Sequence, residues 1–312
     1  MKKTLYSLLT AVLLVSTIGC DNPGPIQVIR DDFPQPSEVS LLMNRENDTL
    51  VVSESSYDFT GLLNDDEEKN PGTILVNGVR SDLGDSNSEF SYSRVMLRDK
   101  NSPIPVSGRF GRYDADPRLD AGTVRVNGTT FSRYEAIIQI RSLSPLYIPA
   151  GVFYKLVSEK KEESKDFAFR PISQYSIDAE GKGAISPFVE RIVSPAEVRL
   201  LDPKPNSLVF RDEDFIVRWK GESGEHVAVV IGLFDDTQKV PAKPLMKLVA
   251  PPHTNSMLIP SKLMQLIPKT SSGRYVFTII SSNVTDDGGI TGYSGKVLVQ
   301  SSSIHNVTVL LR

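Results

Sequence analysis

The sequence has little cysteine and little histidine. It has a single cysteine, Cys20, and three histidines in 312 residues. Domains held by disulfides need cysteine pairs and thiolate zinc sites need several cysteines, so both are excluded. The histidines, His226, His253 and His305, match no helical motif with two histidines four residues apart. We expect them to be solvated residues of loops or strand edges, and we predict no metal site and no cofactor.

Motifs of catalysis and nucleotide binding are also absent. No Gly-x-Ser-x-Gly segment occurs, and Ser301 to Ser303 fit a strand edge or loop. No glycine-rich loop leads from a strand into a helix, so nucleotide cofactors are not implied. The acidic clusters at residues 65–68, 235–236 and 286–287 lack the alternation of a calcium loop, and the last one fits a hairpin turn. We predict no catalytic residues and a protein that is not an enzyme.

Long apolar runs are equally scarce, and the clearest is residues 5–18. Lys2 and Lys3 precede this run of about 14 residues, which is the pattern of a signal peptide. A transmembrane helix needs about 20 apolar residues. The run ends in Ser-Thr-Ile-Gly19-Cys20, which resembles the bacterial lipobox. The resemblance implies that residues 1–19 are a lipoprotein signal peptide cut between Gly19 and Cys20, and that Cys20 carries the lipid.

The charge balance excludes further classes of partner. Without Lys2 and Lys3 the chain has 33 basic and 38 acidic residues, a net charge of about −5. Such a chain is poorly suited to nucleic acid, or to anionic lipid through a basic patch. The lipid on Cys20 is therefore the predicted membrane contact. This places the protein in the cell envelope, at the outer membrane or on the periplasmic face of a bacterial membrane.

The region after the anchor divides into a tether and a β-rich segment. Residues 20–37 are rich in proline and are predicted to be a lipidated tether. Residues 38–193 contain short runs of β-branched and aromatic residues separated by turn clusters, which predicts an N-terminal all-β domain. Asn77-Gly78 and Asn127-Gly128 are predicted hairpin tips, because Asn-Gly readily takes the positive φ angles of a type I′ turn.

Residues 194–312 are predicted to be a second β domain. Phe215, Val217 and Trp219 share one strand face, and the strand at residues 275–279 has a matching apolar face, so the two pack as a sandwich. The opening Leu-Leu-Asp-Pro at residues 200–203, the strand ending in Trp219 and the late strand carrying Tyr275 resemble fibronectin type III and immunoglobulin-like domains.

A short helix is predicted between these strands. Ser261 is positioned to cap its start, Leu263 and Leu266 to point inward, and Pro268 to end it. No strand–helix–strand alternation occurs along the chain, which argues against a parallel α/β sheet. The predicted fold is all-β, with two β-sandwich-like domains behind a signal peptide and a short Pro-rich tether.

The remaining route to a binding site is the aromatic content of the first domain. Aromatic side chains dominate core burial, so we expect them mainly in the core, although some could form a face for sugar or peptide. We predict a non-catalytic binding or structural module with an envelope protein or a glycan as partner. The alternatives are an envelope hydrolase acting on polysaccharide, recognisable by a close carboxylate pair, and an accessory subunit of an envelope complex. The aromatic residues concerned are Tyr92, Phe110, Tyr113, Phe131, Tyr134, Tyr147, Phe153, Tyr154, Phe167 and Phe169.

Overall fold

The structure is a computed structural model that describes residues 33–42, 50–52, 72–84, 86–108, 111–140, 146–159, 167–221, 225–235 and 240–312. The protein is almost entirely β, which confirms the predicted all-β class. Residues Pro34–Arg312 form one compact unit. Gly19 and Cys20 lie outside the described residues, so cleavage and lipidation there stay predictions.

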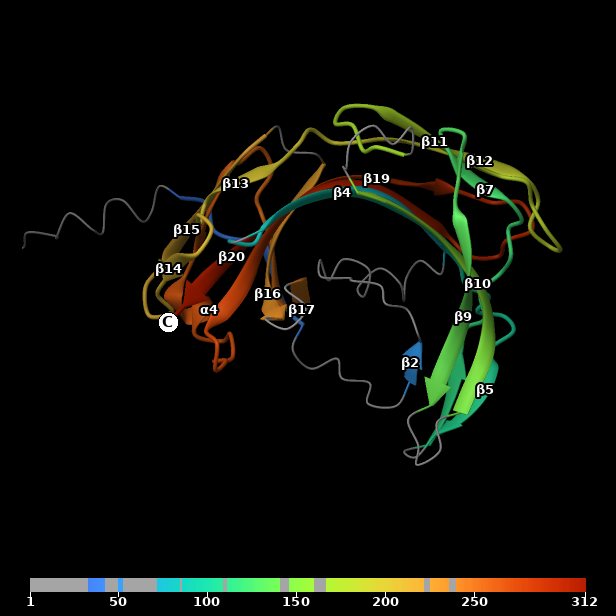
Figure 1. The fold of residues 1–312 in the computed structure, drawn as a ribbon, viewed down its shortest axis with the longest axis horizontal. Coiled ribbons are helices and arrows are strands. Elements are labelled where there is room, and N and C mark those ends of the chain that lie inside the picture. The colour runs from blue at the N-terminus through green and yellow to red at the C-terminus, as the bar shows by residue number, and fades with distance from the viewer. Residues whose placement is uncertain are drawn as a thin grey trace, which may run out of the picture. The chain divides into compact units, whose positions relative to one another are not determined.

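One large sheet dominates this unit (Figure 1). Among the described residues it has eleven strands, and β20 pairs parallel with β3 and antiparallel with β19. Ten of the strands follow one another in the order β1 (Glu38–Leu41), β17 (Val240–Val249), β16 (His226–Asp235), β19 (Arg274–Gly288), β20 (Val297–Leu311), β3 (Gly72–Asp82), β4 (Asn87–Leu97), β10 (Leu146–Glu159), β9 (Ser132–Ile140) and β2 (Leu50–Val52). The eleventh, β14 (Ser207–Val209), pairs with β20.

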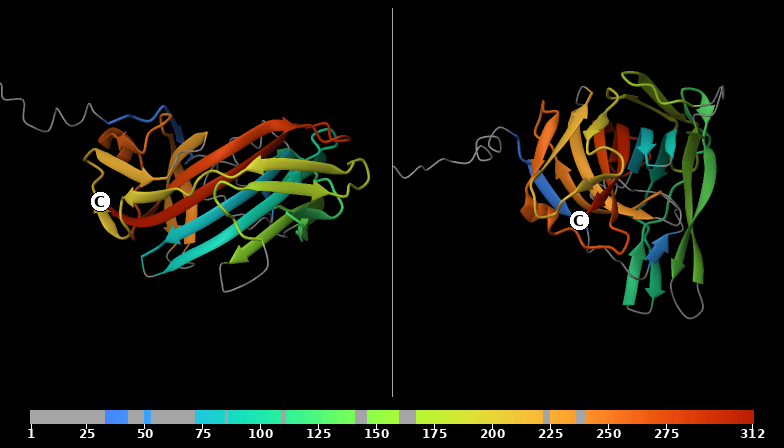
Figure 2. Two further views of the ribbon diagram at one scale, coloured as in Figure 1. Left: turned by 90° about the horizontal axis from the view of Figure 1, so that it is seen from above. Right: turned by 60° about the vertical axis from the view of Figure 1, so that its left-hand side comes forward.

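Smaller sheets complete the described fold (Figure 2). One has the order β13 (Arg199–Asp202), β15 (Phe215–Lys220) and β18 (Ser256–Ile259). Another has the order β12 (Phe188–Val193), β11 (Gln174–Ala179), β7 (Val124–Val126) and β8 (Thr129–Thr130). Strands β5 (Ile104–Gly108) and β6 (Gly111–Ala115) form a hairpin, and α4 (Ser261–Met264) is a single helical turn.

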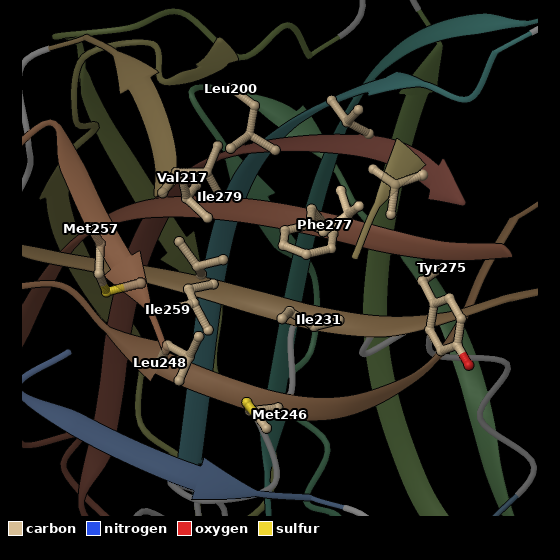
Figure 3. Packing of buried hydrophobic residues seen from close by; sticks show 14 of the residues in the cluster. Leu200, Val217, Ile231, Met246, Leu248, Met257, Ile259, Tyr275, Phe277 and Ile279 are labelled. Carbon is tan, nitrogen blue, oxygen red and sulfur yellow. The ribbon is translucent and has the colours of Figure 1, made fainter. Parts of the chain in front are cut away.

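Two large apolar cores lie between these layers. The first draws its residues from β13, β15 and β18 on one side and from β16, β17, β19 and β20 on the other (Figure 3). The second joins β7, β11 and β12 to β3, β4, β10 and the start of β20. Strand β20 therefore contributes to both cores, which explains why the large sheet continues from one to the other.

Alternation along β20 shows how one strand serves two cores. Because successive side chains point to opposite faces, every second residue lies on the same side of the sheet. On the side of the two cores, two valines enter the second core, three polar residues follow, and three aliphatic residues enter the first core. In chain order these residues are Val297, Val299, Ser301, Ser303, His305, Val307, Val309 and Leu311.

Two segments cross the boundary expected at residue 194. Strand β1 pairs with β17, on the C-terminal side of that boundary. Ile290, Tyr293, Val297 and Val299 belong to the core that is otherwise built from residues 74–192. The sheet is thus continuous across the expected boundary, and whether residues 194–312 fold alone stays a prediction.

The end of the expected tether is attached to the sheets. The Pro34 carbonyl oxygen accepts the Leu258 N–H at 2.9 Å, and the Ser37 N–H donates to the Val249 carbonyl oxygen at 2.9 Å. The prediction that the tether extends to residue 37 was therefore wrong for residues 34–37, whose backbone hydrogen bonds hold them against β17 and β18. Residues 20–32 lie outside the described part of the chain.

The two Asn-Gly pairs have different structures. Asn127 and Gly128 have φ angles of 47° and 84° in the turn between β7 and β8, which confirms the predicted hairpin tip. The prediction for Asn77-Gly78 was wrong, because both residues lie inside β3 and pair with β4. A Cβ atom at Gly78 would lie 2.3 Å from the Phe169 ring, so this glycine makes room for an aromatic side chain.

The short helix forms where expected but is capped differently. Pro260 is the N-cap residue, and Ser261 is the first helical residue without a side-chain cap bond, so its predicted capping role was wrong. The Ser261 N–H instead donates to Asp214 Oδ1 at 2.8 Å. Leu263 packs against the first core as predicted, whereas Leu266 is exposed.

Candidate binding face on strands β4, β9 and β10

The aromatic residues of the first domain divide by exposure. Phe131, Tyr154 and Phe167 are buried in the second core, as expected for most of this set. Tyr92, Phe153 and Phe169 are partly buried, while Tyr134 and Tyr147 are exposed. Phe110 lies outside the described residues, and the side chain of Tyr113 is likewise not described. The exposed tyrosines are the residues able to meet a ligand directly.

Strand pairing places Tyr134 on a defined face of the large sheet. Residues that pair directly in an antiparallel sheet lie on the same face. Tyr134 pairs with Phe153, and two residues further along β10 Lys155 pairs with Arg94. The opposite face of these strands carries the residues that enter the second core. We call the side with Tyr134 the aromatic face, and we use this name for Tyr92, Arg94, Tyr134, Phe153, Lys155 and Val157. Phe153 also packs against a small apolar cluster that contains the buried Ala136.

The centre of this face is a stack of two rings. The ring centroids of Tyr134 and Phe153 lie 5.4 Å apart with an interplanar angle of 20°. The Arg118 guanidinium carbon lies 5.8 Å from the Phe153 centroid. Phe153 is partly buried, whereas Tyr134 is 45% exposed. The inner ring therefore orients the outer one, and offset stacking adds about 0.5–1.5 kcal/mol beyond area burial.

Cationic side chains lie beside the aromatic rings. The Lys155 ammonium nitrogen is 5.7 Å from the Tyr92 ring centroid, within the range of a cation–π contact. Arg94, which pairs with Lys155, is 1% exposed, and its Nη2 lies 3.0 Å from Met96 Sδ. Val157 extends the face with an exposed apolar side chain. The aromatic face therefore combines aromatic rings with the positive charge of Lys155.

Asp120 has a strongly shifted pKa and links several segments of the chain through hydrogen bonds. Asp120 accepts from the Tyr154 hydroxyl at 2.6 Å and from the Gly122 N–H at 3.0 Å. It also accepts from Lys182 Nζ at 2.9 Å and Arg133 Nη2 at 3.1 Å. Burial acts to raise the pKa of Asp120, but these donors outweigh burial and hold that pKa well below its usual range. Such a carboxylate stays ionised, so it is unsuited to act as a general acid near neutral pH.

Tyr154 shares this cross-link from the core side. Its hydroxyl also accepts the Ala121 N–H at 2.8 Å. Burial raises the pKa of Tyr154, and the hydrogen bond to the Asp120 carboxylate raises it further. The tyrosine therefore remains a neutral donor that ties β10 to the loop before β7.

The histidines and serines differ in part from expectation. His226 and His253 are exposed, as predicted. The prediction for His305 was wrong, because it lies inside β20 and is 2% exposed. Ser301 to Ser303 are also buried in β20, so their expected position at a strand edge or in a loop was wrong. Paired neighbours on both sides bury this polar stretch within the large sheet.

The acidic clusters give no assembled metal site in the described part of the chain. Residues 65–68 and 236 lie outside it, and Asp235 ends β16. The prediction of a hairpin turn at residues 286–287 was wrong, because both residues belong to strand β19. No group of three or more His, Cys, Asp or Glu side chains is placed to hold a metal ion among the described residues.

No helix among the described residues is long enough to cross a membrane, since α4 has a single turn.

Sequence reasoning missed the arrangement of the aromatic face, although it named its aromatic members. The signal was the polar neighbours Arg133 and Glu135 on either side of Tyr134, which indicate a half-exposed strand. Contact with Phe153 depends on the register of β9 with β10, which no local pattern specifies. Comparison with protein-family models gives no match, and no curated protein compared with the chain is significantly similar.

Proposed function

We propose that this protein is a lipid-anchored, non-catalytic binding module of the bacterial cell envelope, and that its aromatic face binds glycan. The observation that carries the proposal is the exposed Tyr134 ring stacked on Phe153. The lipobox-like residues ending in Cys20 support the anchor. An anchored module with an oriented aromatic surface can hold a polymer close to the membrane.

A glycan suits this surface for physical reasons. An aromatic ring offers an apolar face together with a polar tip, and the C–H-rich face of a sugar ring can stack on it. Because Phe153 already fixes the orientation of Tyr134, little conformational entropy is lost when a ligand binds. Lys155 favours an acidic glycan over a neutral one.

We also propose that residues 194–312 form an immunoglobulin-like sandwich. Sheet β13-β15-β18 faces strands β17, β16, β19 and β20 across the first core, and Trp219 lies in that core. In support, Tyr275 at the start of β19 donates its hydroxyl to the Pro268 carbonyl oxygen, a contact that resembles the tyrosine corner of such domains. A sandwich of this kind is consistent with a structural or binding role.

The binding proposal is tested by a titration of the full-length protein in detergent micelles with polygalacturonate and, separately, with dextran. Tyr134→Ala should weaken polygalacturonate binding at least about tenfold, because the stacking surface is lost. Tyr134→Phe keeps the ring and should bind like the wild type. Dextran should bind more weakly than polygalacturonate.

Tyr147→Ala is the matched control. Tyr147 is exposed on the same β9–β10 hairpin, and the β-bulge between Pro149 and Val152 separates it from Phe153 and puts it on the other side of the sheet. The control variant should bind polygalacturonate normally. Equal losses for Tyr134→Ala and Tyr147→Ala, or unchanged binding by Tyr134→Ala, would contradict the assignment.

The anchor is tested separately. Cys20→Ser should abolish labelling with a fatty-acid analogue and leave the precursor uncleaved, because a hydroxyl cannot replace the thiol as lipid acceptor. Equal labelling of variant and wild type would show that Cys20 is not the lipidation site.

The second candidate function is that of an accessory subunit in an envelope complex. Strand β1 stands at one end of the large sheet, and its Val39 and Leu41 side chains are exposed. A partner strand could add to such an edge. Val39→Lys with Leu41→Lys would then disrupt a co-purifying complex without changing glycan binding.

A further inference from the structure

The polar stretch of β20 holds the chain that leads from β12 into β13. The Val198 N–H donates to Ser303 Oγ at 3.1 Å, and the Leu200 N–H donates to His305 Nδ1 at 2.9 Å. These side chains lie between the valines of the second core and the aliphatic residues of the first. The connection between the two layers is therefore fastened to β20 by side chains as well as by packing.

The second ring nitrogen of His305 contacts β3. His305 Nε2 lies 2.9 Å from Asp82 Oδ2. Because Nδ1 accepts the Leu200 N–H, the neutral ring carries its proton on Nε2 and donates it to Asp82. One buried imidazole thus joins β13, β20 and β3.

The surroundings disfavour the charged ring. Burial lowers the pKa of His305, the hydrogen bond and charge of Asp82 oppose that shift, and Arg80 and Arg199 add to it. Arg80 Nε lies 3.6 Å from Asp82 Oδ1, and Arg199 Nη2 lies 2.7 Å from Glu197 Oε1. The β19 neighbour, Ile279, is not ionisable. These are the charged groups of β3 and β13 that act on the ring.

We propose that His305 is a proton-sensitive joint, in which the neutral ring fastens β13 to β20 and protonation at Nδ1 releases it. A proton on Nδ1 turns the acceptor of the Leu200 N–H into a donor, so that hydrogen bond breaks. The bond from Nε2 to Asp82 persists, and the positive ring stays beside the carboxylate. Acidification therefore loosens the start of β13 and leaves the paired strands of the large sheet intact.

Amide hydrogen exchange of the full-length protein in micelles tests the joint. Exchange at each pH is divided by the intrinsic rate at that pH, which gives a protection factor for the Leu200 amide. This factor should fall at least about tenfold between pH 7.5 and pH 5.0, while the Val229 amide of β16 keeps its protection. Constant protection of Leu200, or an equal fall at Val229, would overturn the proposal.

His305→Gln is the non-titrating variant. The glutamine amide can accept the Leu200 N–H and donate to Asp82, but it cannot take up a proton in this range. Leu200 protection in this variant should be independent of pH. A fall as large as in the wild type would overturn the proposal, because another group would then cause it.

Two further variants keep the proposal testable if His305→Gln does not fold. Asp82→Asn removes a charge that favours the protonated ring, so the pH midpoint of the protection change should move down. Arg199→Gln removes a charge that disfavours it, so the midpoint should move up. Shifts in the same direction, or no shift in either variant, would contradict the joint, since a merely structural role predicts no opposed pair.

Discussion

Tyr175 and Tyr275 make the same pair of backbone hydrogen bonds at the starts of β11 and β19. Each hydroxyl donates to the carbonyl oxygen seven residues earlier and accepts the N–H of the residue five earlier. The partners are Ala168 and Arg170 for Tyr175, and Pro268 and Thr270 for Tyr275. Tyr275 belongs to the first apolar core and Tyr175 to the second. The same hydrogen-bonding pattern therefore occurs at the edge of each core.

Removing either hydroxyl should destabilise the protein. Tyr175→Phe and Tyr275→Phe each remove part-buried hydrogen bonds to the backbone, and a typical hydrogen bond contributes about 0.5–1.5 kcal/mol. Urea unfolding measures the loss, and Tyr134→Phe, with an exposed hydroxyl, is the control. Unchanged midpoints for both corner variants would show that these hydrogen bonds do not hold the strands.

Trp219 tests the first core. It is 1% exposed, so its fluorescence should be blue-shifted and poorly quenched by iodide. Trp219→Ala should destabilise by about 3–5 kcal/mol, because a large aromatic site is emptied. A variant with the wild-type melting temperature, together with efficient quenching in the parent, would place the ring at the surface instead.

Asp120 should make the free energy of unfolding depend on pH in the acidic range. Its hydrogen-bond donors hold the folded pKa below that of the unfolded chain, about 3.9, so its contribution is present above that value. The contribution is lost as the pH falls toward the folded pKa, because the unfolded chain binds the proton first. Asp120→Asn should lower stability at pH 7 and lose this acid slope in unfolding experiments, whereas Asp212→Asn at an exposed position should not. An unchanged slope in Asp120→Asn would count against the cross-link.

Gly78 should accept a side chain only if Phe169 is shortened. Gly78→Ala places a methyl group against the Phe169 ring and should destabilise by about 1–3 kcal/mol. Phe169→Ala removes the ring, so the double variant should lose less stability than the sum of the two single changes. Strict additivity in urea unfolding would mean that the ring does not occupy this space.

Local alternation predicted part of the fold. Phe215, Val217 and Trp219 face the first core because period-two patterning is a property of the strand itself. Asn127-Gly128 forms its turn because the positive φ angles are a local preference. Asn77-Gly78 is the same dipeptide, but it lies in strand β3, where it pairs with β4 and Phe169 packs against Gly78.

Long-range pairing could not be predicted from such patterns. The parallel pair of β20 with β3 joins residues more than two hundred positions apart, Ser303 with Gly78 for example. That pairing buries His305 and the serines, which read as exposed when their neighbours are unknown. The aromatic face was likewise hidden, because contact of Tyr134 with Phe153 depends on strand register.

The most direct test of the account is a hydrogen-exchange footprint of bound polygalacturonate on the full-length protein in micelles. We predict added protection in β4, β9 and β10 around Tyr92, Tyr134 and Lys155, and unchanged exchange in β12 and β1. Protection confined to β1 or β12, with none on the aromatic face, would contradict it.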